Sequence, residues 1–183
     1  MGQQVEETDT AQVGKKILQG KQTQKVLAFY KPVGVTCTER DPHAEKKIMD
    51  MIRYPERLTY AGRLDKDSEG LILLTNDGDL INAMMRGANR HEKEYIVKTD
   101  REITPDFLEK MAKGIYLKDL DITTRECEIE QIGKFTFRIV LTQGVNRQIR
   151  RMCEACGYRV KALKRIRIMN ILLGDLKPGK WRE

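Results

Sequence analysis

The sequence contains no long apolar run and no secretory signal. None of its apolar stretches approaches the ~18 residues that a membrane-spanning helix needs, and the N-terminus is polar from the start. Met1-Gly2 could open a myristoylation signal, but Glu6 stands where that signal requires Ser or Thr. We therefore expect a soluble, cytoplasmic protein that does not bind membranes.

The sequence also lacks a disulfide framework and a recognisable zinc motif. Its four cysteines, in a chain without a signal peptide, do not suggest a disulfide scaffold. Cys153 and Cys156 have C-x-x-C spacing, but no second ligand pair accompanies them, and we expect both to pack in a core. Residues 91–95 depart from the zinc motif H-E-x-x-H at the last position, which is Tyr95. A P-loop and a G-x-G-x-x-G motif are also absent.

Positive charge is in excess and is concentrated in one region. The chain carries 34 Lys and Arg against 27 Asp and Glu, a formal net charge of +7. Between residues 147 and 167 only Glu154 opposes a series of basic residues, namely Arg147, Arg150, Arg151, Arg159, Lys161, Lys164, Arg165 and Arg167. Such a distribution favours a polyanionic partner and says nothing about the fold.

The apolar pattern predicts one domain after a short leader. Residues 1–24 have no apolar period, and we expect them to be flexible or weakly helical. We assign residues 25–183 to a single domain. Its predicted strands cover residues 26–30, 58–61, 71–75, 95–99, 124–132 and 134–142, and residues 158–173 are rich in strand-forming types. Its predicted helices cover residues 44–53, 79–86, 104–113 and 146–156.

A polar, charged loop over residues 60–70 interrupts two apolar runs. Gly62 and Gly70 supply backbone freedom at its edges. Between the glycines lie four charged side chains, those of Arg63, Asp65, Lys66 and Asp67. This composition is typical of an ordinary solvated turn, and it also fits a loop that carries chemistry on a rigid frame.

The helix predicted over residues 146–156 separates apolar from cationic side chains. At about 100° per residue, one side holds Ile149, Met152, Cys153 and Cys156. The other side presents three guanidinium groups outward, those of Arg147, Arg150 and Arg151, and Asn146 is the expected N-cap. Arginines at this spacing repel one another, so they need an anionic partner unless they are merely solvated.

Several separated motifs in this order resemble those of the RsuA/RluF-type pseudouridine synthases. They are Gly62-Arg-Leu-Asp65, Gly70-Leu-Ile-Leu-Leu-Thr-Asn-Asp-Gly78, Lys93-Glu-Tyr95 and Gln143-Gly-Val-Asn-Arg-Gln-Ile-Arg-Arg-Met152. The resemblance extends from Val26 to Arg182. Within the family, the motif sequences most resemble those of the enzymes that modify large-subunit ribosomal RNA.

The resemblance implies an α+β fold, in which a central, mainly antiparallel sheet is flanked by helices and crossed by an active-site cleft. It implies no metal and no cofactor. It also implies isomerisation of a uridine in a folded stem-loop of ribosomal RNA to pseudouridine, by a monomer that does not bind DNA. The base must leave its stack for this chemistry, and an aromatic face recovers part of that cost.

The resemblance also assigns roles to individual residues. Asp65 is the essential carboxylate, Tyr95 stacks on the flipped base, and Arg150 is the basic partner of Asp65. A carboxylate beside an arginine can act as a nucleophile toward the sugar or as a base at C2′, and the sequence leaves both open. We expect six residues to contact RNA, namely Arg63, Lys31, Lys93, Arg147, Arg151 and Arg165.

Two alternatives accompany this interpretation. A non-catalytic RNA-binding module on the same fold would need the basic face but not Asp65, Tyr95 and Arg150 together. A DNA-binding helix over residues 147–151 is disfavoured because no turn-helix partner precedes it. Members of the family commonly carry an S4 domain before the catalytic one, and we expect none within the short leader.

Overall fold

The computed structural model describes residues 10–13, 16–19, 22–86 and 89–183. Its strands are β1 (Thr10–Val13), β2 (Lys16–Gln19), β3 (Val26–Lys31), β4 (Thr59–Ala61), β5 (Glu69–Thr75), β6 (Lys93–Thr99), β7 (Tyr116–Leu117), β8 (Ile122–Thr123), β9 (Glu128–Gly133), β10 (Thr136–Leu141), β11 (Val160–Ile168), β12 (Ile171–Leu172) and β13 (Trp181–Arg182). Its helices are α1 (Gly78–Met85), α2 (Pro105–Lys113) and α3 (Gln148–Ala155), and its 3-10 turns are η1 (Ile48–Met51) and η3 (Lys118–Leu120).

One large mixed sheet organises the described residues. Its strand order is β13-β3-β5-β11-β6-β10-β9, with β4 paired to β5 and β12 paired to β11. All pairings between named strands of this sheet are antiparallel except β5 with β11, which are parallel. The α+β fold and its mainly antiparallel sheet confirm the expectation from the sequence. We call the strands β13, β3, β4 and β5 the β3 half, and β11, β6, β10 and β9 the β6 half.

The β3 half is buried on both faces. Strand β5 contributes Leu71 and Leu73 to one face and Ile72 and Leu74 to the other, because side chains alternate along a strand. The segment around η1 covers the Ile72 face, and α1 covers the Leu71 face. The unbroken apolar run of β5 is typical of a strand enclosed in this way.

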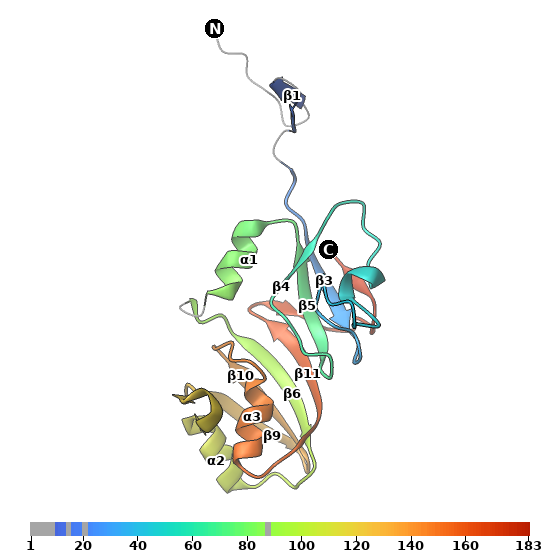
Figure 1. Ribbon diagram of the computed structural model, residues 1–183. Coiled ribbons are helices and arrows are strands. Elements are labelled where there is room, and N and C mark those ends of the chain that lie inside the picture. Colours follow the sequence, from blue (N-terminus) through green and yellow to red (C-terminus); the bar gives the residue numbers. More distant parts are fainter. Residues whose placement is uncertain (1–9, 14–15, 20–21, 87–88) are drawn as a thin grey trace.

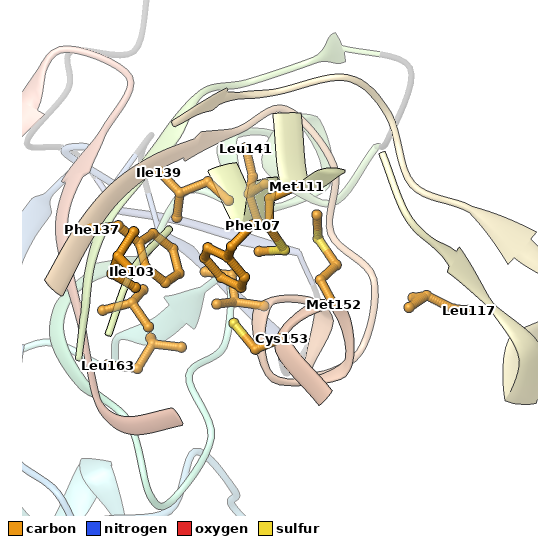
Figure 2. Close-up of a cluster of buried hydrophobic side chains, with 12 residues drawn as sticks. Ile103, Phe107, Met111, Leu117, Phe137, Ile139, Leu141, Met152, Cys153 and Leu163 are labelled. Carbon is orange, nitrogen blue, oxygen red and sulfur yellow. The ribbon is translucent and has the colours of Figure 1, made fainter. Parts of the chain in front are cut away.

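The β6 half is buried on one face, where α2 and α3 pack (Figures 1 and 2). From β10, Phe137 and Ile139 enter this core. Arg138, between them, faces the other side and forms ion pairs with Glu94, Glu128 and Glu130. The alternating pattern of this strand therefore predicted the burial of Phe137, Ile139 and Leu141 correctly, but Phe135 is 39% exposed and Val140 is buried.

The sulfur atoms of α3 belong to the same core. Cys153 is fully buried and Cys156 packs against the cluster, which confirms the expectation of core packing. Burial raises the pKa of the Cys153 thiol to about 12. Helix α2 also follows its prediction, since the Thr104 hydroxyl accepts a hydrogen bond from the Phe107 amide and Pro105 is its first residue.

The helix predicted over residues 44–53 is absent, apart from the single turn η1. The Thr36 amide donates to the Lys46 carbonyl, and the Ile48 amide donates to the Thr36 carbonyl. These bonds form a parallel bridge with residue 36 and hold Lys47 in an extended conformation. A long-range pairing therefore replaces the first helical turn that the local pattern favours.

The predicted leader, residues 1–24, lies largely outside the described residues. Within the part that is described, β1 and β2 pair as an antiparallel hairpin. Every helix in the described ranges is too short or too polar to cross a lipid bilayer.

A close approach of two backbones joins the halves. Strand β11 meets β5 at two pairs only, Lys164 with Glu69 and Arg165 with Gly70. A Cβ atom on Gly70 would lie 2.2 Å from the Arg165 carbonyl oxygen. Gly70 also has a φ of +115°, which favours glycine.

We expect the substitution Gly70→Ala to lower the free energy of unfolding by about 3 kcal/mol, from this clash and the unfavourable φ. Urea denaturation followed by circular dichroism measures the change. The matched control is Gly78→Ala at the start of α1, where an added Cβ meets nothing within 4 Å. That variant should be unchanged or up to about 1 kcal/mol more stable. Equal stability of the two variants would contradict the role assigned to Gly70.

Candidate active site

A cleft of about 540 Å³ opens where the two halves of the sheet meet. Strand β5 pairs with β11 only at its start and with β4 farther along, so the β4–β5 loop of residues 62–68 rises beside β11. The N-terminal end of α3 and the start of β6 also line the cleft. The charged residues that line the cleft are Arg63, Asp65, Lys66, Lys93, Arg147, Arg150 and Arg165, and Tyr95 lies among them.

Backbone hydrogen bonds fix the β4–β5 loop. The Ser68 amide donates to the Asp65 carbonyl at 3.1 Å, which closes a turn around Asp65. The Gly34 amide donates to the Lys66 carbonyl at 2.7 Å and ties the loop to the turn after β3. Gly62 has a φ of +80° at the beginning of the loop. The polar loop singled out in the sequence is therefore a fixed wall of the cleft.

Arg147 bridges the two carboxylates of this loop. Its guanidinium donates to both oxygens of Asp67, at 3.1 and 2.9 Å, and its Nη1 lies 3.4 Å from Asp65 Oδ2. The hydrogen bond from Arg147 is the largest of the causes that lower the pKa of Asp67. Asp65 thus shares a cation with Asp67.

Arg150 contacts Asp67 and Ser68 instead of Asp65. Its Nη2 donates to the Asp67 carbonyl and to Ser68 Oγ, each at 3.1 Å, and its Nη1 lies 3.5 Å from Asp67 Oδ2. Only 12% of its side chain is exposed. The expectation that Arg150 is the partner of Asp65 therefore needs correction, because the ion pair that the structure forms with Asp65 comes from Arg147.

Two further expectations about α3 were wrong. The N-cap residue is Arg147, in a left-handed conformation with a φ of +51°, and not Asn146. The three arginines do not all point into solvent, because Arg147 and Arg150 turn onto the β4–β5 loop. Arg151 does not line the cleft, and its guanidinium bonds the Asn146 carbonyl and lies 3.7 Å from Asp119.

Two of the predicted RNA contacts are buried. Lys31 is fully buried, and its ammonium donates to the carbonyls of Pro32 and Val35, so it holds the turn after β3 and cannot reach RNA. Arg165 is 2% exposed. Its Nε donates to the Leu71 carbonyl and its Nη1 donates to the Arg63 carbonyl. Arg165 therefore holds the backbone of the β4–β5 loop at Arg63.

Strand β6 brings Lys93 and Tyr95 to the cleft on one face, as their spacing predicts. Tyr95 pairs with Arg165 of β11 on one side and with Ile139 of β10 on the other. Burial lowers the pKa of Lys93, and the nearby Arg165 lowers it further. The side chains of β6 therefore form the floor of the cleft.

Asp67 is the residue whose role the sequence did not reveal. It resembles any solvating loop acid, yet it contacts two arginines of α3. The available signal was the mutual repulsion of the arginines at 147, 150 and 151, which demands an anion nearby. Among the described residues, no group of three His, Cys, Asp or Glu side chains converges as a metal site would require.

This fold and this cleft agree with what sequence comparison finds. Residues 25–155 match the family described as RNA pseudouridylate synthase. The match covers most of the chain, and the chain therefore belongs to this family, as the resemblance of its motifs implied.

Two curated proteins and one solved structure are similar to this chain over most of its length. The dual-specificity RNA pseudouridine synthase RluF of Escherichia coli (strain K12) is 43% identical over 185 aligned residues, which cover 100% of this chain and 63% of that protein. The ribosomal large subunit pseudouridine synthase B of Vibrio cholerae is 35% identical, over 87% of this chain and 51% of that protein. A crystal structure of pseudouridylate synthase superposes with a TM-score of 0.82 at 26% identity, over 98% of this chain and 78% of that one.

The contact between Asp67 and Arg147 predicts a pH dependence of stability. The folded-state pKa of Asp67 is lowered, so the stabilisation is complete above the unfolded pKa of about 3.9 and is lost as pH falls through the folded value. Since Asp67 is half exposed, solvent limits the effect to less than about 1 kcal/mol.

We expect Asp67→Asn to shrink the difference in the free energy of unfolding between about pH 6 and about pH 2. Urea denaturation at both pH values measures it. Asp175→Asn, which replaces an exposed acid with no ion pair among the described residues, should leave the difference unchanged. The same response from both variants would argue against the contact.

Proposed function

We propose that this chain isomerises a uridine of ribosomal RNA to pseudouridine. The observation that carries the proposal is the position of Asp65, which lies with Tyr95 in a single cleft lined by arginines. Family membership supports the reaction class, and the ribosomal substrate rests on the names of relatives. This chain spans 63% and 51% of two of those relatives, so their activities are extended to it as a proposal.

The size of the cleft suits one flipped nucleotide. Its volume of about 540 Å³ falls in the range of roughly 300–1,000 Å³ that holds small ligands. A uridine paired within a stem cannot present C1′ or C5 to a carboxylate, so the enzyme acts on the extruded nucleotide. In this proposal Tyr95 stacks on the uracil ring and offsets part of the lost base stacking.

Asp65 is the reagent in the proposed reaction. Its carboxylate either adds to C1′ of the ribose or removes the C2′ proton, and in both routes the C1′–N1 bond breaks. The freed uracil rotates, C5 bonds to C1′, and the C5 hydrogen leaves. Arg147 contacts Asp65 directly, while Arg150 acts through Asp67 and Ser68, which it holds in place.

In this proposal, arginines at the exposed rim of the cleft bind the phosphates of the RNA. Arg63 lies on the β4–β5 loop, and Arg147 is 40% exposed even with its carboxylate contacts. A net charge of +7 favours association with RNA. We also propose that residues 25–183 form one catalytic domain.

We expect Asp65→Asn to lower the rate of pseudouridine formation by about 10³-fold or more, since Asp65 is the only carboxylate among the described residues that line the cleft. A transcript of large-subunit ribosomal RNA, tritiated at uridine C5, reports the reaction through release of tritium. RNA affinity, measured by filter binding, should stay within a few-fold of wild type.

The control for this experiment is Asp175→Asn, which should react as fast as wild type. Wild-type activity in the Asp65 variant would refute the assigned role. Binding of the transcript without tritium release by the wild-type chain would favour the non-catalytic RNA-binding module.

Arg63→Ala tests the phosphate contact. We expect weaker binding and a plot of log affinity against log salt whose slope is smaller by about 0.9, because one contact to phosphate is lost. Lys134→Gln is the control, since Lys134 lies in the β9–β10 turn, at the opposite end of β10 from the cleft. An unchanged slope for Arg63→Ala would place Arg63 away from the RNA backbone.

A further inference from the structure

Two cationic side chains that line the cleft keep hydrogen-bond donors that have no acceptor among the described residues. Among the described residues, the Lys93 ammonium forms no hydrogen bond or ion pair, although burial lowers its pKa. Arg165 binds two carbonyls through Nε and Nη1, but its Nη2 is buried without an acceptor. The two groups are close enough for Arg165 to lower the pKa of Lys93.

This arrangement is costly, and the same chain avoids it elsewhere. Lys93 is half-buried, and taking a cation partly out of water without giving it a partner is unfavourable. Lys31, which is fully buried, has two carbonyl oxygens at 2.8 Å that satisfy its ammonium. The Lys93 ammonium instead lies near Gly144, another cleft residue, on which an added Cβ atom would be 4.0 Å from it. The floor of the cleft is therefore arranged to receive negative charge.

The position of Lys93 indicates which negative charge it meets. Lys93 and Tyr95 lie on the same face of β6, about 7 Å apart along the strand. If Tyr95 stacks on the uracil, Lys93 lies at the edge of the ring, where O2 and O4 are. In the proposed function, Arg63 and Arg147, which also line the cleft, meet the phosphates of the RNA backbone instead.

The proposed reaction creates an anion at this place. When the C1′–N1 bond breaks, its electron pair stays on N1, and the uracil carries a negative charge that is shared with O2 and O4. The charge disappears when C5 donates a pair to C1′, and N1 gains a proton as C5 loses one. No oxidant or reductant is needed.

We propose that Lys93 stabilises this uracil anion by donating a hydrogen bond to a ring oxygen, and that Arg165 is the positioning residue behind it. The inference rests on the proposed function and adds a catalytic residue to it. A fixed donor in a water-poor site stabilises developing charge without reorganisation. Lys93 keeps its proton throughout the reaction.

Removal of the charge tests the inference. We expect Lys93→Met to lower the single-turnover rate of tritium release from the labelled large-subunit transcript by about 10²-fold or more. RNA affinity should stay within a few-fold of wild type, and Lys93→Arg should recover part of the rate. The variant should be as stable as wild type or more stable, because an unsatisfied charge is gone.

Lys31→Met is the matched control, since the same substitution there removes a satisfied ammonium and should destabilise the fold. A pH profile adds a second measurement. The wild-type rate should fall as pH rises through the lowered pKa of Lys93, below its ordinary 10.5, whereas Lys93→Arg should hold its rate to higher pH. The charged groups that share the cleft with Lys93 are Arg63, Asp65, Lys66, Arg147, Arg150 and Arg165.

Two results would overturn the inference while the proposed function stands. One is a wild-type rate in Lys93→Met, and the other is a loss that weaker RNA binding explains entirely, which would make Lys93 a phosphate contact. An inactive wild-type chain would overturn the proposed function and this inference with it.

Discussion

The close approach of Gly70 to the backbone of Arg165 is the constraint on which the cleft depends. It lets β11 lie parallel to the start of β5 and so joins the two halves of the sheet. Farther along, β5 pairs with β4, and the loop between these strands has to rise beside β11. The cleft exists because one edge of β5 serves two partners in turn.

Arg165 links this backbone contact to the chemistry above it. Its side chain, buried at the junction, donates to the carbonyls of Leu71 in β5 and Arg63 at the start of the β4–β5 loop, and thereby ties the loop to the strand that follows it. The arginines of α3 hold the same loop from the other side through Asp67. Asp65 therefore lies on a loop that is held on two sides, which limits the motion of its carboxylate.

Four of the cationic residues that line the cleft differ in how far the protein itself supplies acceptors for them. Arg147 and Arg150 donate to carboxylate or carbonyl oxygens of the β4–β5 loop, so part of their charge holds that loop, although Arg150 Nε is buried without an acceptor among the described residues. The groups on the floor, Lys93 and Nη2 of Arg165, have no such partners within the described chain. A site that must stabilise charge only during a reaction has this character, because its donors are set in place beforehand.

The sequence by itself determined the family, the elements with strong local signals and the loop that carries Asp65. The cap and proline of α2, the alternation in β10 and the apolar run of β5 act over a few residues, so they are readable without a fold. Pairings that join distant segments were decided only by the tertiary structure. They replaced the helix at residues 44–53 by a bridge to Thr36, placed Arg147 rather than Arg150 beside Asp65, and buried Lys31 and Arg165. Residue type tells which charge a side chain carries, but burial and partner depend on which strands meet.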